Sequence, residues 1–270
     1  MTQTVQESPL IRRLIAPNPS PMTGPGTNTY LITSTGRCTV IDPGPDDTAH
    51  IDAILEAAQS DHAQIDMILV THSHRDHYPG ALELQDRTGA LLAGHPSIAR
   101  VNYPIEHGQE ILLPGCVAEA IFTPGHASDH FCFLLKDDGS LLSGDLILGQ
   151  GTVVVSPPDG NMDDYMASLR SLRDYQIERI FPGHFGRVDD PRAKIEEYIN
   201  HRLEREHQIL DEIAEGALTI PAIVQRLYQG LGERLMRAAE GSVLAHLISL
   251  ERQGRVKRDG LTDPPRYTIA

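Results

Sequence analysis

The chain has 270 residues, 40% of them hydrophobic and 22% charged, which is typical of one large globular domain or of a medium domain with a small appendage. No run approaches the roughly 20 apolar residues that span a bilayer, the first residues lack the pattern of a secretory signal, and three widely spaced cysteines predict reduced thiols. We therefore expect a cytoplasmic protein with no membrane partner. The net charge is −14, and the whole excess lies in residues 1–191, which disfavours tight nucleic-acid binding unless a local basic patch overrides it.

Residues 10–181 alternate short apolar runs with turns and helical patterns. Apolar residues at helical spacing predict helices over residues 48–58, 81–87 and 162–175, and Asn161 is a favourable cap for the last of these. Short apolar or alternating runs predict strands over residues 10–15, 29–33, 37–41, 67–70, 90–93, 109–113, 117–122, 130–135, 140–143 and 179–181. This mixture of strands and helices indicates an α/β (α+β) fold.

The chain after residue 190 has a different pattern. Asp190 followed by Pro191 is typical of a helix start, and this helical pattern continues to about residue 215. Further helical patterns start at residue 219 and cover residues 231–252, and a hairpin around a polar turn follows over residues 256–269. Short helices and a hairpin form a winged-helix pattern. We therefore expect one domain over residues 1–190, and a linking helix with a winged-helix-like domain over residues 191–270.

The strongest functional signal is the run from His72 to His77, which reads His-Ser-His-Arg-Asp-His directly after the predicted strand 67–70. Residues two apart in an extended segment point to the same side, so His72 and His74 can hold one metal ion together. Asp76 and His77 lie in the turn that follows and can face a second ion. Imidazole nitrogen and carboxylate oxygen suit zinc, and four ligand-type residues among six argue against coincidence.

Three further ligand-type residues follow predicted strands at comparable positions. His126, Asp145 and His184 each come after an apolar run and a turn that contains glycine. Each alone is a weak signal, because Pro-Gly and related pairs mark turns everywhere. One segment cannot complete two metal sites, however, so we expect these three side chains to join the first group.

The His-x-His-x-Asp-His run, followed in order by TPGH, SGD and PGH, resembles the metallo-β-lactamase superfamily over most of residues 10–190. The C-terminal winged-helix pattern makes the chain similar to the β-lactamase-like-protein-2 group, which includes a mitochondrial endoribonuclease. The resemblance implies a four-layer αββα sandwich with the metal site at one edge, and a small C-terminal winged-helix domain. It implies two zinc ions, with Asp145 bridging them, the first held by His72, His74 and His126 and the second by Asp76, His77 and His184.

The predicted function is zinc-dependent hydrolysis. Metal binding lowers the pKa of water toward about 7, so the resemblance implies a metal-bridging hydroxide that attacks the ester, thioester or lactone carbonyl of a small-molecule substrate. The predicted catalytic residues are Asp145, as the bridge, and Asp76, as ligand and proton acceptor. The alternatives are a metal-dependent endoribonuclease on single-stranded RNA and a mononuclear-iron sulfur oxidoreductase, which keeps the same motif. A binding module without activity ranks last, because all seven expected ligands are present.

Neighbouring residues leave two interpretations open. Asp42 either orients a ligand histidine or only shapes the turn before Pro43, and the sequence weighs both evenly. Asn28 and Tyr30 either approach the site or pack the first hairpin, and we expect packing; for His130 we expect a structural role. Tyr78 stands where many relatives carry a small residue, which predicts a reshaped pocket wall.

The C-terminal segment carries a basic cluster where the wing would begin, made of Arg252, Arg255, Lys257 and Arg258. The cluster could contact phosphates, but acidic residues flank it and it contains no aromatic side chain for base stacking. We therefore expect the segment to act as a lid or wall over the active site that selects the substrate. A dimer contact is the other role left open, and it would make the protein a homo-oligomer.

Overall fold

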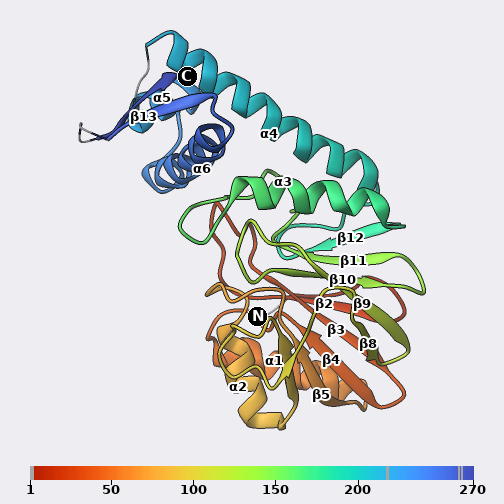
Figure 1. Cartoon of the computed structure of the whole chain (residues 1–270). Coiled ribbons are helices and arrows are strands. Elements are labelled where there is room, and N and C mark those ends of the chain that lie inside the picture. The colour runs from red at the N-terminus through yellow and green to blue at the C-terminus, as the bar shows by residue number, and fades with distance from the viewer. Residues whose placement is uncertain (1–2, 217–218, 261, 263) are drawn as a thin grey trace.

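Two stacked β-sheets, built from strands between Gln3 and Pro182, form the centre of the larger part of the molecule (Figure 1). The computed structural model describes residues 3–216, 219–260, 262 and 264–270. Seven strands lie in chain order in the first sheet: β1 (Gln3–Gln6), β2 (Ile11–Ile15), β3 (Asn28–Ser34), β4 (Arg37–Ile41), β5 (Gln64–Leu69), β6 (Leu91–Gly94) and β7 (Tyr103–Pro104). The second sheet has the order β12 (Arg179–Pro182), β11 (Ser140–Gly144), β10 (Phe131–Leu135), β9 (Cys116–Phe122) and β8 (Glu110–Leu113).

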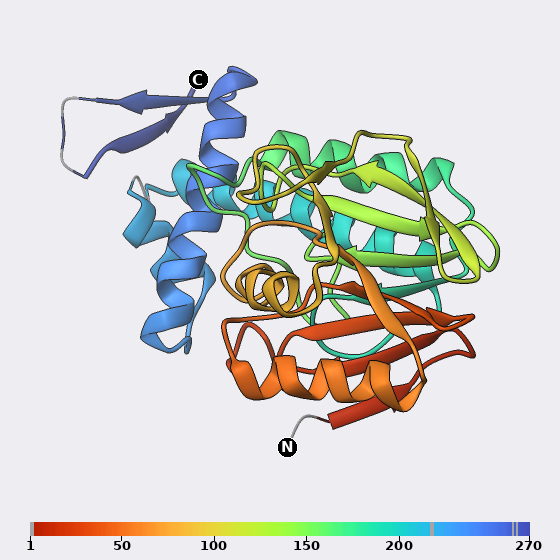
Figure 2. The ribbon, with the colours of Figure 1, turned by 90° about the horizontal axis from the view of Figure 1, so that it is seen from below.

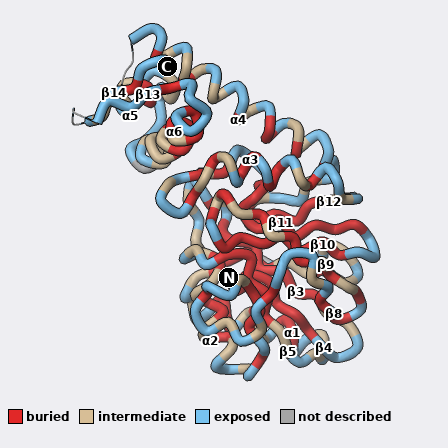
Figure 3. The backbone as a smooth tube through the Cα atoms, in the orientation of Figure 1, coloured by how far each residue is buried: buried red, intermediate tan, exposed pale blue. Residues whose placement is uncertain are grey.

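Helices cover the outer face of each sheet, which gives the four layers. In Figure 1, α1 (Thr48–Ser60) and α2 (Pro79–Thr88) lie below the first sheet, while α3 (Met162–Ser171) and α4 (Pro191–Ala214) lie above the second. A separate cluster of buried apolar side chains fills each of the three interfaces between layers, and buried residues are concentrated in the strands (Figure 3). The predicted αββα sandwich is therefore confirmed.

Local sequence signals set the ends of the main helices. The Asn161 side chain accepts hydrogen bonds from the backbone N–H groups of Asp163 and Asp164, which start α3 as predicted. Asp190 caps α4 in the same way, with Pro191 at its first turn. The helix predicted over residues 162–175 ends at Ser171 and continues as a 3₁₀ turn over Leu172–Asp174.

Two strands of the first sheet were not predicted. β1 consists of Gln3–Gln6, sequence QTVQ, and pairs antiparallel with β2. β7 contains only two residues, paired with the end of β6. Neither has the apolar alternation by which a strand is recognised. Both lie at the edges of the sheet, where each pairs with one neighbour and where strands are often very short.

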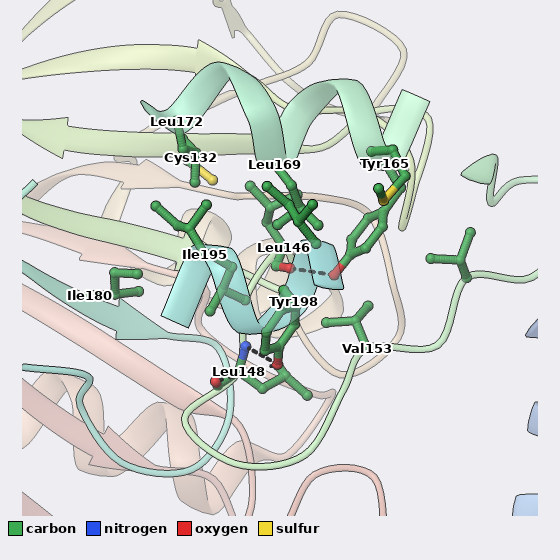
Figure 4. Close-up of a cluster of buried hydrophobic side chains, with 14 of the residues drawn as sticks. Cys132, Leu146, Leu148, Val153, Tyr165, Leu169, Leu172, Ile180, Ile195 and Tyr198 are labelled. Atoms are coloured by element: carbon green, nitrogen blue, oxygen red, sulfur yellow. Dashed lines mark hydrogen bonds between the residues drawn. The ribbon is translucent and has the colours of Figure 1, made fainter. Parts of the chain in front are cut away.

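Tyrosines of α3 and α4 hold the loop that follows β11, as Figure 4 shows. The Tyr165 hydroxyl donates to the Leu146 carbonyl oxygen over 2.8 Å, and the Leu148 backbone N–H donates to the Tyr198 hydroxyl oxygen over 3.0 Å. All four residues belong to the apolar cluster beneath these helices. This packing fixes the loop that begins at the predicted ligand Asp145.

The C-terminal segment contains α5 (Ile220–Leu227), α6 (Glu233–Arg252) and a hairpin of β13 (Val256–Asp259) and β14 (Arg266–Ile269). With the end of α4 it forms a fourth apolar cluster of its own. The pattern of short helices and a hairpin is confirmed, while residues 261 and 263 of the predicted turn lie outside the described residues. None of the helices in the described ranges is long and apolar enough to cross a bilayer.

Candidate metal centre

The predicted ligand-type side chains meet at one edge of the sandwich, between the two sheets. The segment from His72 to His77 follows β5 of the first sheet, and His126, Asp145 and His184 follow β9, β11 and β12 of the second. β11 and β12 are parallel, and β10 pairs antiparallel with both β9 and β11. β9, β11 and β12 therefore run in one direction and end at the same edge, which brings residues far apart in sequence together.

Three groups of ligand-type atoms have the spacing that a metal ion needs. Within each group the atoms lie within 4.8 Å of one another, and the groups are His72, His74 and His126; His72, His77 and Asp145; and Asp76, His77 and His184. Together they contain all seven of the side chains predicted from the sequence. Which residue holds which ion stays a prediction.

Several of the inward-facing atoms lack the partner that their burial requires. His72 Nε2 and Asp145 Oδ1 are buried without a hydrogen-bond partner among the described residues. Ring nitrogens face ring nitrogens, at 3.0 Å between His126 and His74 and at 3.3 Å between His77 and His184. Buried polar atoms normally find a partner, and a cation between these lone pairs would satisfy all of them. The donor set, imidazoles with carboxylates, fits zinc.

The Nδ1 atoms of three of the histidines have partners outside the centre, so their Nε2 atoms are the ones that face it. His72 Nδ1 lies 2.9 Å from Thr71 Oγ1, and His126 Nδ1 lies 2.8 Å from the Val154 carbonyl oxygen. His184 Nδ1 lies 3.4 Å from the Gly26 carbonyl oxygen. Partners of this kind fix the ring orientation of a metal-binding histidine.

Asp42 performs the same task for His77. Its Oδ2 atom lies 2.8 Å from His77 Nδ1 and accepts a hydrogen bond from Thr71 Oγ1 over 2.7 Å, and its Oδ1 atom accepts from the Thr71 backbone N–H over 2.8 Å. Asp42 has a positive φ of 48°, a conformation that aspartate tolerates better than most residues. Of the two interpretations of Asp42, orientation of a ligand histidine is the one that the geometry supports.

The Asp145 carboxylate lies between the two ends of the centre. It is 3.4 Å from the Nε2 atoms of both His77 and His184, and 3.5 Å from His126 Nε2. His130 fixes the Asp145 backbone, because its Nε2 accepts from the Asp145 N–H over 3.1 Å while its Nδ1 lies 2.9 Å from Thr123 Oγ1. The structural role expected for His130 is thus confirmed, at a position directly behind the carboxylate.

The electrostatics of the pocket favour ionised carboxylates. Burial opposes the charged form of Asp76, but His77 and His184 outweigh it and lower the pKa of this carboxyl to about 2. Burial likewise disfavours charge on His184, but Asp145 overcomes it and raises its pKa to about 9. At His72 burial dominates and lowers the pKa of the ring well below its usual value.

A cavity of about 530 Å³ opens over the ligand-type side chains. Its floor includes His74, Asp76, His126, Asp145 and His184. Its walls come from several segments: Pro21–Thr23, Leu148, the loop over residues 150–156, Asp159, Phe185 and, from the C-terminal segment, Leu235 of α6. A site of this volume accommodates a small organic molecule.

Comparison with known proteins decides the family. A model of the metallo-beta-lactamase superfamily matches residues 22–184. The chain belongs to the metallo-beta-lactamase superfamily. A second model, of the beta-lactamase associated winged helix domain, matches residues 219–263, so the predicted winged helix is confirmed as well.

Relatives that share the superfamily fold match almost the whole chain. A beta-lactamase-like protein 2 homolog of Drosophila melanogaster is 36% identical and covers 94% of this chain and 92% of its own length. An atrochrysone carboxyl ACP thioesterase of Aspergillus chevalieri is 31% identical, with 93% of this chain and 86% of its own length covered. Among solved structures, a metallo-beta-lactamase family protein of Thermus thermophilus has a TM-score of 0.82 at 25% identity, covering 97% of this chain and 99% of its own.

Two expectations about residues around the candidate metal centre need correction. Tyr78 is not among the described residues that line the cavity; it precedes α2, and its hydroxyl donates to the Ala99 carbonyl oxygen over 2.5 Å. Asn28 and Tyr30 do more than pack the first hairpin. The Asn28 amide donates to the carbonyl oxygens of Pro182 and Phe185, and the Tyr30 hydroxyl donates to that of Pro182, so both hold the turn that carries His184.

Sequence reasoning missed the partners that come from backbone atoms and from distant loops. The carbonyls of Gly26 and Val154 carry no residue-specific signal, so nothing in the sequence marks them. Asp159, which lies 3.4 Å from His74 Nε2, stands in a loop without a motif. Only Thr71, directly before His72, could have been found, as a hydroxyl adjoining the first ligand.

The basic cluster of the winged helix is partly neutralised. Arg252 forms an ion pair with Asp163 at 3.3 Å, and Arg255 pairs with Glu206 of α4. Lys257 and Arg258 are exposed on β13. Two of the four basic side chains are therefore used in ion pairs within the protein, Arg252 with α3 and Arg255 with α4.

Proposed function

We propose that this protein is a zinc-dependent hydrolase that cleaves an ester, thioester or lactone of a small substrate at a dinuclear centre. The observation that carries the proposal is the close grouping of histidine and aspartate ligand atoms beneath an open cavity, with His72 Nε2 and Asp145 Oδ1 buried without a hydrogen-bond partner. We assign His72, His74 and His126 to one ion, Asp76, His77 and His184 to the other, and Asp145 to both. The domain division at residues 190 and 191 is proposed with it.

Zinc, when bound, supplies the Lewis acidity that makes water a nucleophile near neutral pH and polarises a carbonyl oxygen. The chain supplies the rest. Asp42 and Thr71 hold the rings of His77 and His72 in place. Asp76 lies in the cavity and is ionised at neutral pH, so its carboxylate can accept the proton of the attacking water. Asp145, held from behind by His130, keeps the two halves of the centre in register.

Two features favour a carbonyl substrate over RNA. None of the described residues that line the cavity is Lys or Arg, so the lining offers no cationic side chain to pair with an RNA backbone. A relative 31% identical to this chain is named as a thioesterase acting on an acyl carrier protein. The endoribonuclease alternative keeps one supporting observation, the exposed Lys257 and Arg258 on the wing.

The test is a substrate panel on zinc-loaded protein. We expect turnover of 4-nitrophenyl esters, acyl thioesters or lactones, lost on chelation and restored by zinc, with two zinc ions per chain by elemental analysis. Cleavage of single-stranded RNA without turnover of any carbonyl substrate would contradict the proposal and support the endoribonuclease function. One iron ion per chain, together with consumption of oxygen, would instead support the sulfur oxidoreductase function.

A further inference from the structure

The C-terminal helix α6 reaches the cavity of the proposed active site. Leu235, near its start, lines the cavity although it lies far beyond the last predicted ligand in sequence. Apolar side chains of Met22, Leu148, Val153 and Phe185 line it as well. Figure 2 shows α6 lying along the side of the catalytic part. A winged-helix segment thus contributes an apolar residue to the site.

The contacts of α6 with the catalytic part are close. A Cβ atom on Gly241 would lie 2.3 Å from Ser156 Oγ and 2.9 Å from Ser156 Cβ, so any larger residue here would displace the Ser156 side chain or the helix. At the other end of the helix the Ser249 hydroxyl donates a hydrogen bond to the Asp163 carboxylate, and Arg252 forms an ion pair with the same carboxylate. These contacts hold α6 from Gly241 to Arg252, and Leu235 lies in the same helix less than two turns before Gly241.

The loop of residues 150–156 lies between the helices α4 and α6 on one side and the metal centre on the other. On the side of α4, the Tyr198 hydroxyl donates to the Gly151 carbonyl oxygen over 2.9 Å, and the Arg202 guanidinium donates to the Val153 carbonyl oxygen. On the other side, the neighbouring Val154 carbonyl oxygen lies 2.8 Å from His126 Nδ1. The same loop therefore forms the cavity wall, contacts α6 and orients a predicted ligand.

We propose that Leu235 is a specificity-determining residue, and that the winged-helix segment is a wall of the substrate site that binds the apolar part of an acyl group. The inference rests on the proposed hydrolase function. An acyl chain fits because the wall side chains are apolar, and none of the described lining residues is a Lys or Arg that could pair with a carboxylate or phosphate beside them. A charged carrier attached to the acyl group would then lie outside the cavity.

The first experiment measures acyl-chain selectivity. The ratio of kcat/KM for 4-nitrophenyl octanoate to that for the acetate is compared between wild type, Leu235→Ala and Leu231→Ala, all loaded with zinc. Loss of a leucine side chain from an apolar wall lowers this ratio about tenfold, through KM for the longer ester. Leu231 is a partly exposed leucine just before α6 and is not among the described lining residues, so its variant keeps both the ratio and the activity.

The outcomes separate the two proposals. An unchanged ratio in Leu235→Ala, with the acetate still hydrolysed, overturns the role of Leu235 and leaves the hydrolase function standing. Absence of any ester or thioester turnover by the zinc-loaded wild type overturns the proposed function. In that case calorimetric titration with an octyl thioether still decides the inference, because binding weakened about tenfold by Leu235→Ala, and not by Leu231→Ala, supports an apolar subsite, and equal binding overturns it.

A second experiment tests the seating of α6. Gly241→Ala pushes the helix away from Ser156, so we expect it to lower the octanoate-to-acetate ratio as Leu235→Ala does. Adding Ser156→Gly removes both atoms that the new methyl group meets, leaving Ser156 Cα at 3.7 Å as the nearest, and the double variant should recover the ratio. Failure of the single variant to change the ratio, or of the double variant to recover it, would show that this contact does not position Leu235.

Discussion

The Asp42 carboxylate connects two segments of the metal centre. It binds the backbone and hydroxyl of Thr71, next to the first ligand, and the ring of His77 at the end of the motif. It is 2% exposed, so water cannot replace its hydrogen bonds. The segment from Thr71 to His77 is therefore held at both ends by one side chain.

The variant Asp42→Asn should lower zinc affinity at the Asp76, His77 and His184 end of the centre by about 10- to 100-fold, the usual cost of losing such an outer partner. An amide is a weaker acceptor, and it leaves the His77 ring free to adopt the wrong tautomer. Zinc titration against a competing chelator measures the change. Asp46→Asn, at an exposed aspartate in the same turn, is the control. Equal zinc affinity in both variants would show that Asp42 does not orient His77 for metal binding.

The variant Asp145→Ala should reduce zinc loading and lower kcat by orders of magnitude while the fold stays intact. The side chain contacts the ring nitrogens of His77, His126 and His184, but the backbone at this position is held by His130 and by the packed loop behind it. Elemental analysis, turnover and circular dichroism together measure the three effects. Near-normal turnover would mean that another group joins the two halves of the centre.

Among the elements, α3 shows why the turn before His126 contains glycine. Gly125 has a φ of 133°, and a Cβ there would lie 2.3 Å from the backbone N and Cα atoms of Tyr165 in α3. The Asn161 backbone N–H also donates to the Gly125 carbonyl oxygen over 2.8 Å. The start of α3 and the turn carrying His126 are thus packed backbone against backbone.

Asn161→Ala should therefore lower the free energy of unfolding by about 1 kcal/mol, the typical cost of losing an N-cap. Two N–H groups of the first turn lose their acceptor, at 3.0 Å and 3.4 Å in the native protein. Denaturation by urea measures the difference. Asn161→Asp keeps a capping oxygen and should stay close to wild type; equal losses in both variants would show that the cap is not what matters at this position.

For the whole molecule, the distribution of charge separates the candidate substrates. The net charge is −14, none of the described residues that line the cavity is Lys or Arg, and two of the four basic residues of the wing are used in ion pairs with other helices. A polyanion would have to bind through Lys257 and Arg258 against this field. A neutral acyl substrate meets no such opposition.

We expect weak binding of single-stranded RNA, little altered when Lys257 and Arg258 are both changed to Ala. If these residues did bind the RNA backbone, the slope of log affinity against log salt would become less steep by about 0.7 for each phosphate that the variant no longer neutralises. Fluorescence anisotropy with a labelled oligonucleotide over a range of salt concentrations measures the slope. Tight binding that the double substitution abolishes would make the endoribonuclease the leading function.

The fold class and the seven ligand-type side chains could be predicted from the sequence alone. Both depend on local patterns: strand and helix periodicity, caps such as Asn161, and ligand-type residues placed directly after strands. Tertiary structure alone decided which atoms orient those side chains, such as the carbonyls of Gly26 and Val154, and which distant residue lines the cavity. Leu235 lies in an ordinary amphipathic helix, and only the docking of α6 at Gly241 places it beside the site. Contacts of this kind depend on the distance between elements that are far apart in the sequence, and no local sequence pattern encodes that distance.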